Sequence, residues 1–229
     1  MLKAFASKFQ YIDRSSCAIG TDIAPEILGP CGPPHDVSGA CLVKEKNLNK
    51  AIGARLKELR LKAGLSLNEL ATRSGVSRAM IGRIERAESS ATAALLGKLC
   101  AALDITLSAV VGLSDRPPER LTRKADQPVW RDPETGYRRR HASAQNAASG
   151  IEIIVVELPE GKRVSYSPWG RRAYTQQLLL LGGQLSIFVG EKRFDLDEGD
   201  CFDFDVMRPV SFENSGRTPA SYIVIVRHS

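Results

Sequence analysis

The sequence lacks the features of a membrane or secreted protein. No run of eighteen or more apolar residues occurs in its 229 residues, which excludes a transmembrane helix. The N-terminal segment Met1–Phe5 carries a charge but no continuous apolar core, so it does not have the pattern of a secretory signal. We therefore expect a cytoplasmic protein with no membrane partner.

Cysteine and histidine are also scarce. The five cysteines are odd in number and show no CxxC spacing, which argues against a disulfide framework and against a zinc ribbon. We expect reduced thiols, mostly buried or incidental. The three histidines, His35, His141 and His228, are far apart in the chain.

Positive charge is in modest excess and unevenly distributed. Thirty-two Lys and Arg against 26 Asp and Glu give a net charge of +6. Residues 48–112 contain ten basic and five acidic residues, whereas residues 151–229 contain nine basic and eleven acidic residues. This asymmetry favours a polyanionic partner for the middle of the chain only.

The chain divides into four segments. Residues 1–47 show no period and contain a Gly/Pro cluster, so we predict a disordered extension. Residues 48–113 predict five short helices, and residues 114–150 a loop-like linker. Residues 151–229 predict short strands separated by turns, as in an antiparallel sandwich or barrel. The predicted fold class is α+β in two domains: an all-α five-helix domain, then an all-β barrel.

The predicted helices have recognisable ends. Apolar residues step by three or four positions from Leu48 onward, and this helix ends at Gly64. Ser66 and Glu69 have the capping-box spacing at the start of the second helix. Ser77 caps the third. The second and third helices are therefore separated by only a tight turn.

That helical pair carries a specific resemblance. Apolar residues on both sides of the Ser74–Ser77 turn would hold the two helices at a fixed angle. Residues 50–112 resemble the helix-turn-helix domain of the phage-repressor-like (xenobiotic response element, XRE) family. The resemblance implies binding to double-stranded DNA, with the second helix of the pair in the major groove.

The resemblance also implies which residues contact DNA. Arg78 and Arg83 are expected to bond guanine O6 and N7, whereas Ala79 reaches only a thymine methyl group. Ser66 and Ser77 are expected at phosphates. The predicted DNA-binding residues are Ser66, Leu67, Arg73, Ser77, Arg78, Ala79, Arg83 and Arg86.

Three residues depart from the family pattern. Leu67 stands where many relatives carry a DNA-contacting Gln, and Ala87 replaces the usual turn glycine. Gly82 lowers the stability of the second helix of the pair by roughly 1 kcal/mol relative to Ala. These departures affect the individual contacts more than DNA binding itself.

The C-terminal third resembles the cupin family, a double-stranded β-helix barrel, over Gln176–Val189 and Gly199–Asn214. Enzymes of that family hold a transition metal with three His and one Glu. Their positions fall here on Trp169 and Arg171 (or Gly170 and Arg172), Gln176 and Val210. Because these are poor metal ligands, we expect no metal, no cofactor and no enzymatic activity.

A barrel of this size can hold one small ligand. Arg171 or Arg172 together with Gln176 suits an anionic or polar effector such as a carboxylate. Alternatively, these arginines point outward and the barrel only dimerises, through long apolar edge strands. The run Arg138–His141 is expected in the solvated linker, with contacts to DNA phosphates or to a ligand as alternatives. The candidate effector-binding residues are Trp169, Arg171, Arg172, Tyr174, Gln176, Arg208 and Val210.

These predictions together describe a sequence-specific transcriptional regulator. Two helix-turn-helix domains that contact neighbouring DNA half-sites bind more specifically than one, so we expect a homodimer. Two other classes stay open: a metal-dependent cupin enzyme carried on a DNA-binding head, and an antitoxin-type repressor that binds a protein partner.

Overall fold

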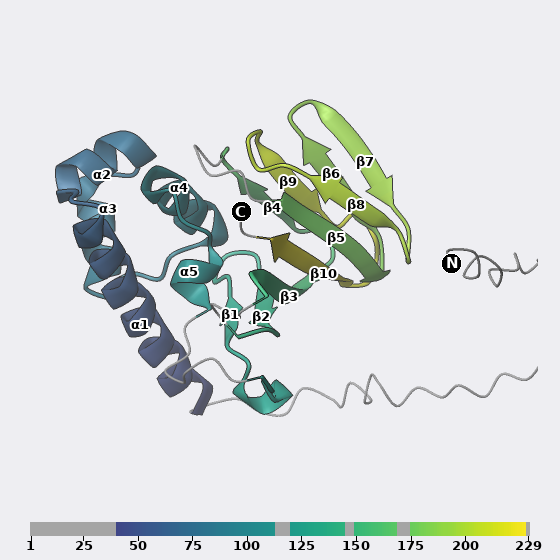
Figure 1. Ribbon diagram of the computed structural model, residues 1–229, viewed down its shortest axis with the longest axis horizontal. Helices are drawn as coiled ribbons and strands as arrows, with labels where there is room; N and C mark the ends of the chain where they lie inside the picture. The colour runs from purple at the N-terminus through teal and green to yellow at the C-terminus, as the bar shows by residue number, and fades with distance from the viewer. Residues whose placement is uncertain (1–39, 113–119, 145–148, 169–174, 228–229) are drawn as a thin grey trace, which may run out of the picture. The chain divides into compact units, whose positions relative to one another are not determined.

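The computed structural model describes residues 40–112, 120–144, 149–168 and 175–227. These residues lie in one compact unit, Gly39–Ser229. All of its α-helices precede its strands along the chain (Figure 1). This order confirms the predicted fold class of a helical region followed by a β-rich region.

Five α-helices form the first part of the described chain, as predicted. They are α1 (Ala40–Lys62), α2 (Leu67–Ser74), α3 (Arg78–Glu85), α4 (Ala93–Leu103) and α5 (Ser108–Val111). Helix α1 begins at Ala40 rather than at the predicted Leu48. The apolar step that marks this helix is missing before Leu48, although Ala, Leu, Lys and Glu there favour a helix.

The helices share one apolar core. Leu56 of α1, Leu70 of α2, Ile81 of α3 and Leu96 of α4 are fully buried. Helices α1 and α3 approach closely at Gly53, where a Cβ atom would lie 2.3 Å from the Ile84 carbonyl oxygen. No side chain fits at that position without moving the backbone, so Gly53 sets the distance between the two helices.

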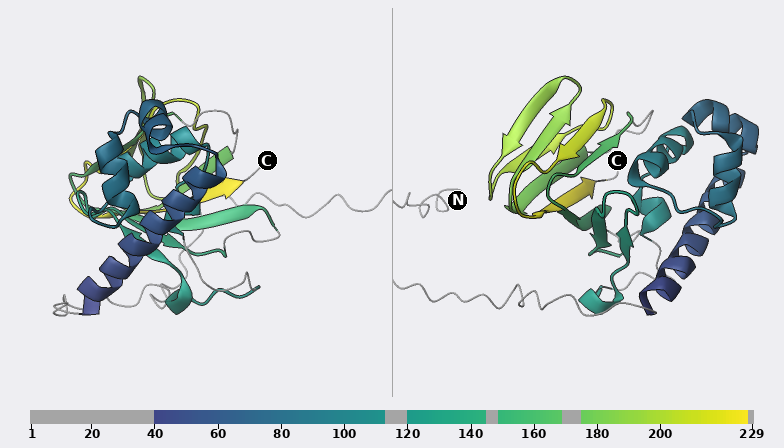
Figure 2. Two further views of the ribbon diagram at one scale, coloured as in Figure 1. Left: turned by 90° about the vertical axis from the view of Figure 1, so that its left-hand side faces the viewer. Right: turned by 180° about the vertical axis from the view of Figure 1, so that it is seen from behind.

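In the described residues, ten strands form two antiparallel sheets, which lie in two layers (Figure 2). The six-stranded sheet has the order β1-β2-β3-β10-β5-β8, and the four-stranded sheet has the order β4-β9-β6-β7. The strands are β1 (Val129–Arg131), β2 (Arg138–His141), β3 (Ile151–Leu158), β4 (Arg163–Tyr166), β5 (Thr175–Gly182), β6 (Leu185–Val189), β7 (Lys192–Leu196), β8 (Cys201–Phe204), β9 (Val210–Glu213) and β10 (Ala220–Arg227). The pairing of β3-β10-β5-β8 with β4-β9-β6-β7 is a double-sheet jelly roll, the architecture to which cupins belong.

Strands β1 and β2 correct one prediction. Both lie within residues 114–150, which were expected to form a loop-like linker. Instead, β2 pairs with β3 and extends the large sheet. The run Arg138–His141 is therefore not a solvated linker: Arg139 and His141 point inward and are 8% and 3% exposed. Four consecutive basic residues do not have the pattern of a strand, and this strand is stabilised by its pairing with β1 and with the apolar β3.

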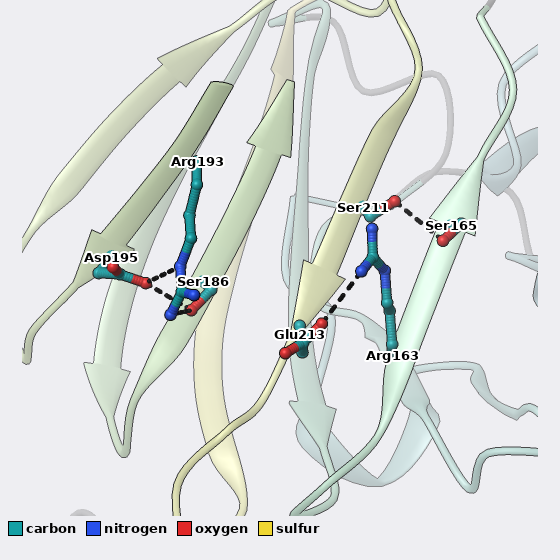
Figure 3. A network of polar contacts seen from close by, with 7 residues as sticks. All are labelled: Arg163, Ser165, Ser186, Arg193, Asp195, Ser211 and Glu213. Atoms are coloured by element: carbon teal, nitrogen blue, oxygen red, sulfur yellow. Dashed lines mark hydrogen bonds and ion pairs between the residues drawn. The ribbon is translucent and has the colours of Figure 1, made fainter. Parts of the chain in front are cut away.

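The outer faces of the two sheets differ in chemistry. The outer face of the large sheet carries an apolar row, because Val155, Ile223 and Leu179 are cross-strand neighbours on β3, β10 and β5. The outer face of the small sheet carries polar networks that join neighbouring strands, which Figure 3 shows. They consist of Arg193 with Asp195 and Ser186, Arg163 with Glu213, and Ser165 with Ser211.

The edge strands also correct a prediction. In the described residues, the edges of the sheets are β1, β8, β4 and β7, which have three to five residues each. The long apolar edge strands expected for dimerisation are therefore not found in this part of the chain. The outer face of the large sheet carries an apolar row instead, through Val155, Ile223 and Leu179.

Candidate nucleic-acid interface and barrel cavity

Local hydrogen bonds hold the turn between α2 and α3. The Ser66 hydroxyl accepts a bond from the Glu69 amide at 3.2 Å, and the Glu69 carboxylate accepts one from the Ser66 amide at 2.8 Å. The Ser77 hydroxyl accepts a bond from the Met80 amide at 3.2 Å. Gly75 ends α2 at a φ of 66°, in the left-handed region that glycine favours. The predicted caps at Ser66 and Ser77 are confirmed.

The capping box also changes the electrostatics of the helix start. The bond from the Ser66 amide lowers the pKa of the Glu69 carboxyl group, and the Ser66 hydroxyl and Arg73 add to this effect. Glu69 is therefore ionised at the positive end of the α2 dipole, where an anion is favourable. The capping box is intact under physiological conditions.

Arg60 holds helix α3 on the side that faces the helical core. Its Nε and Nη2 donate to the two carboxylate oxygens of Glu85 at 2.7 and 2.9 Å, and its Nη1 donates to the Leu65 carbonyl at 2.8 Å. The Arg60 and Glu85 side chains are 7% and 5% exposed. A buried bidentate pair of this kind has a defined geometry, so it sets the orientation of α3 on α1. Sequence reasoning missed this pair because its members are 25 residues apart.

The opposite side of α3 faces solvent. Of the eight predicted DNA contacts, Leu67 is half-buried and the others are exposed. Arg86 forms an ion pair with Glu88 at 2.7 Å, whereas Arg78 and Arg83 form none with any residue that the structure describes. The exposed ones are Ser66, Arg73, Ser77, Arg78, Ala79, Arg83 and Arg86.

The departures from the family pattern have structural counterparts. Ala87 has a φ of 56°, so it occupies the left-handed backbone conformation that glycine would adopt without strain. Gly82 is buried, and a Cβ atom there would lie 3.1 Å from the Arg86 Nη1. The turn after α3 is therefore formed without its usual glycine, at a cost of about 1 kcal/mol.

The barrel encloses a small cavity with a volume of about 40 Å³. Three of the predicted effector residues, Gln176, Arg208 and Val210, line it. The other four, Trp169, Arg171, Arg172 and Tyr174, lie outside the described residues. The lining residues are Thr106, Leu107, Ser108, Tyr137, Arg139, Tyr166, Ser167, Gln176, Phe204, Val206, Arg208, Val210, Phe212, Tyr222, Val224 and Val226.

Arg139 also lines the cavity, although a solvated linker was expected for its segment, with contact to a ligand as an alternative. It lies on β2 opposite Val156 of β3, facing inward. Its Nη1 donates to the Tyr137 hydroxyl at 2.9 Å. Its Nε is buried and has no hydrogen-bond partner among the described residues. The signal in the sequence was the arginine run itself, for which contact with a ligand was an alternative to the solvated linker.

Burial changes the titration of the groups around Arg139. Burial raises the pKa values of the Tyr166 and Tyr222 hydroxyls well above the ordinary range. Burial and the charge of Arg139 lower the pKa of His141 to about 3. At neutral pH these neighbours are therefore uncharged and do not balance the guanidinium.

The described part of the barrel contains two of the expected metal positions, Gln176 and Val210, and neither side chain is a good metal ligand. No group of three His, Cys, Asp or Glu side chains that could hold a metal occurs in the described ranges.

Burial raises the pKa of the Cys100 thiol to about 12, so this cysteine is unreactive. In the same ranges, no helix is both long and apolar enough to cross a membrane.

Comparisons with known proteins agree with this arrangement. A helix-turn-helix family model (HTH_3) matches residues 56–110. The HTH-type transcriptional regulator SutR of Escherichia coli (strain K12) is 28% identical, over 80% of this chain and 98% of that protein. The crystal structure of an HTH_3 family transcriptional regulator from Vibrio cholerae is 26% identical, with a TM-score of 0.67, over 81% of this chain and 99% of that one.

A third similarity is much weaker. Hydroxypropylphosphonic acid epoxidase from S. wedmorenis is 17% identical over 77% of this chain and 97% of that chain, with a TM-score of 0.41. A match at that level says nothing about the activity of this chain. The helix-turn-helix match and the two regulators that align along most of this chain agree with each other. The protein is therefore a transcriptional regulator, with an XRE-type helix-turn-helix domain ahead of a β-barrel domain.

Proposed function

We propose that α3 reads operator DNA in the major groove as one of two heads of a cytoplasmic homodimer. The observation that carries this proposal is the position of Arg78 and Arg83. Both are exposed and without an ion pair in the described part of the chain, on a helix that the buried Arg60–Glu85 pair holds in place. Exposed guanidinium groups on a helix of fixed orientation suit bidentate contacts to guanine.

The apolar outer face of the large sheet supports the homodimer. Its central row runs through Val155, Ile223, Leu179 and Cys201 on four neighbouring strands, and Ile153 and Ile225 lie beside it. Neighbouring apolar side chains on the outer face of a sheet suit an interface with a partner. A second copy of the chain, related by a two-fold axis, would cover it with the same surface.

We further propose that the barrel binds an effector and catalyses no reaction. Gln176 and Val210 stand where two metal ligands would be required, and a neutral amide and an alkyl group supply no metal chemistry. Metal analysis of the purified full-length protein tests this. Stoichiometric iron, manganese or zinc would overturn it in favour of the enzyme alternative.

Selection of binding sites from a random-sequence DNA library with the full-length protein tests the proposed role of α3. We expect one enriched motif with two-fold symmetry. Arg78→Ala and Arg83→Ala should each weaken binding to it by about 1–3 kcal/mol and relax specificity at one base pair per half-site. The matched control is Arg217→Ala, an exposed arginine in the barrel domain. If both α3 variants select and footprint like the wild type, the assignment of α3 is wrong.

Ile223→Lys tests the proposed dimer interface. The side chain lies on the outer face of β10, so a lysine there is compatible with the folded barrel but not with a buried interface. We expect a dimeric wild type and a monomeric variant by size-exclusion chromatography with light scattering. Ser165→Lys on the outer face of the small sheet is the control and should stay dimeric. A variant that dimerises as tightly as the wild type would exclude this face.

A further inference from the structure

Arg139 is a buried cation without an anionic neighbour in the described residues. Its side chain is 8% exposed, and none of the ion pairs in this part of the chain includes it. Its hydrogen bond goes to the Tyr137 hydroxyl, a neutral group. Because arginine does not lose its proton in proteins, the charge stays at every physiological pH.

An uncompensated charge of this kind is costly. Removing a guanidinium group from water costs several kcal/mol, and one neutral hydroxyl returns only part of that. Strands elsewhere in the barrel carry aliphatic residues at comparable inward positions, such as Ile154 and Val156 on β3. A leucine or methionine at position 139 would fill the same space without this cost, so folding alone does not account for the arginine.

The cavity supplies a place for the missing anion. Arg139 and Arg208 both line it, and its described lining contains no Asp or Glu. The Nε of Arg139 has no partner among the described residues. The edge of the guanidinium to which it belongs can donate two parallel hydrogen bonds to a carboxylate. Six of the lining residues, on β8, β9, β10 and the loop after β8, are apolar: Phe204, Val206, Val210, Phe212, Val224 and Val226.

We propose that the barrel cavity binds a small monocarboxylate, whose carboxylate pairs with Arg139 and whose short apolar tail packs against the valine and phenylalanine walls. This inference rests on the effector role proposed above and names its ligand class. The free volume of about 40 Å³ has room for roughly three water-sized positions, which matches a carboxylate with a chain of one or two carbons.

The position of the cavity connects this ligand to the helical domain. Thr106, Leu107 and Ser108, at the start of α5, contribute to the same lining as Arg139. A carboxylate bound there therefore touches the last helix of the helix-turn-helix domain as well as the sheet. Its binding energy would stabilise the contact between α5 and the barrel.

Thermal unfolding and calorimetry of the full-length protein with sodium propionate test the proposal, with sodium chloride at equal ionic strength as reference. We expect propionate to raise the melting temperature of the wild type, whereas propionamide, its neutral counterpart, has no effect. Arg139→Met should lose the response and bind propionate at least tenfold more weakly. Arg138→Met is the matched control, because Arg138 is the preceding residue on β2 and points outward; it should respond like the wild type.

Three outcomes overturn the proposal: no response of the wild type to propionate, an equal response of Arg139→Met, or a larger response to sulfate than to propionate. If Arg139→Met does not fold, Arg139→Lys replaces it, since a single ammonium should keep a weakened response. Selection of DNA sites with the same preparations distinguishes a failure of the carboxylate site from a failure of the proposed regulator. A protein that selects an operator but ignores propionate refutes the carboxylate site alone, whereas loss of site selection refutes the proposed regulator itself.

Discussion

Arg60 in the helical domain and Arg139 in the barrel are both buried, but their surroundings differ. Arg60 pairs with both carboxylate oxygens of Glu85 and also donates to a backbone carbonyl. Arg139 donates to one tyrosine hydroxyl and keeps a buried Nε without a partner among the described residues. Each guanidinium nitrogen of Arg60 thus donates a hydrogen bond, whereas the Nε of Arg139 has no acceptor among the described residues.

The difference separates a structural role from a binding role. A buried cation with its own carboxylate fixes two helices and needs nothing from outside the chain. A buried cation that lines a cavity without a carboxylate is a site prepared for an anion. In this protein the first kind of arginine supports α3, the helix proposed to read DNA, and the second lies where the proposed effector would bind.

The largest effect is expected from Arg60→Met. The variant leaves the buried Glu85 carboxylate without a partner, so the free energy of unfolding should fall by about 3–5 kcal/mol. Urea denaturation followed by far-UV circular dichroism measures the loss. The double variant Arg60→Met/Glu85→Leu removes both charges and should recover part of it. A loss below about 1 kcal/mol for the single variant would mean that the pair does not hold α3.

The pH dependence of the barrel is expected to be the next largest effect. His141 has a pKa of about 3 in the folded protein, lowered by burial and by Arg139, against about 6.5 when unfolded. Below pH 6.5 the unfolded chain binds a proton that the folded chain does not, so stability falls as the pH falls. By pH 5 the loss reaches about 2 kcal/mol. His141→Gln should remove this component of the pH dependence, and an unchanged slope would contradict it.

Arg139→Met should behave in the opposite way to Arg60→Met. Without added carboxylate, it removes an uncompensated charge and breaks no ion pair among the described residues. Its free energy of unfolding should therefore stay within about 1 kcal/mol of the wild type, on the more stable side. The same urea titration gives the comparison. A loss of about 3 kcal/mol would show that the folded chain already supplies Arg139 with a carboxylate.

The smallest effect is expected from Glu88→Gln. The pair Arg86–Glu88 has the same nitrogen–oxygen distance, 2.7 Å, as Arg60–Glu85, but its side chains are 61% and 51% exposed. Water screens such a pair, so the midpoint of unfolding should not change beyond experimental error. A clear shift would mean that distance, rather than burial, determines the contribution of an ion pair here.

Much of the helical domain was predictable because its signals are local. Capping residues at Ser66 and Ser77, the turn glycine at Gly75 and the apolar steps between them all act within a few positions of the chain. The same local pattern predicts which arginines of α3 face solvent. The start of α1 was mispredicted because nothing local marks it.

The cavity was only partly predictable. Gln176, Arg208 and Val210 follow from the resemblance to the cupin family, and all three line the cavity. Arg139 does not, because four consecutive basic residues give no indication of a strand. Its inward position depends on the pairing of β2 with β3, whose apolar residues are more than ten positions away in the chain.

The sequence by itself determined the order of the two domains, the helix-turn-helix and the absence of metal-binding residue types at Gln176 and Val210, because each depends on residue type at short spacing. Only the tertiary structure decided which arginine pairs with a carboxylate and which one lines a cavity. Arg60 and Glu85 meet because α1 packs on α3, and Arg139 turns inward because β2 joins the sheet. Such partners are set by contacts between distant segments, which residue spacing does not encode.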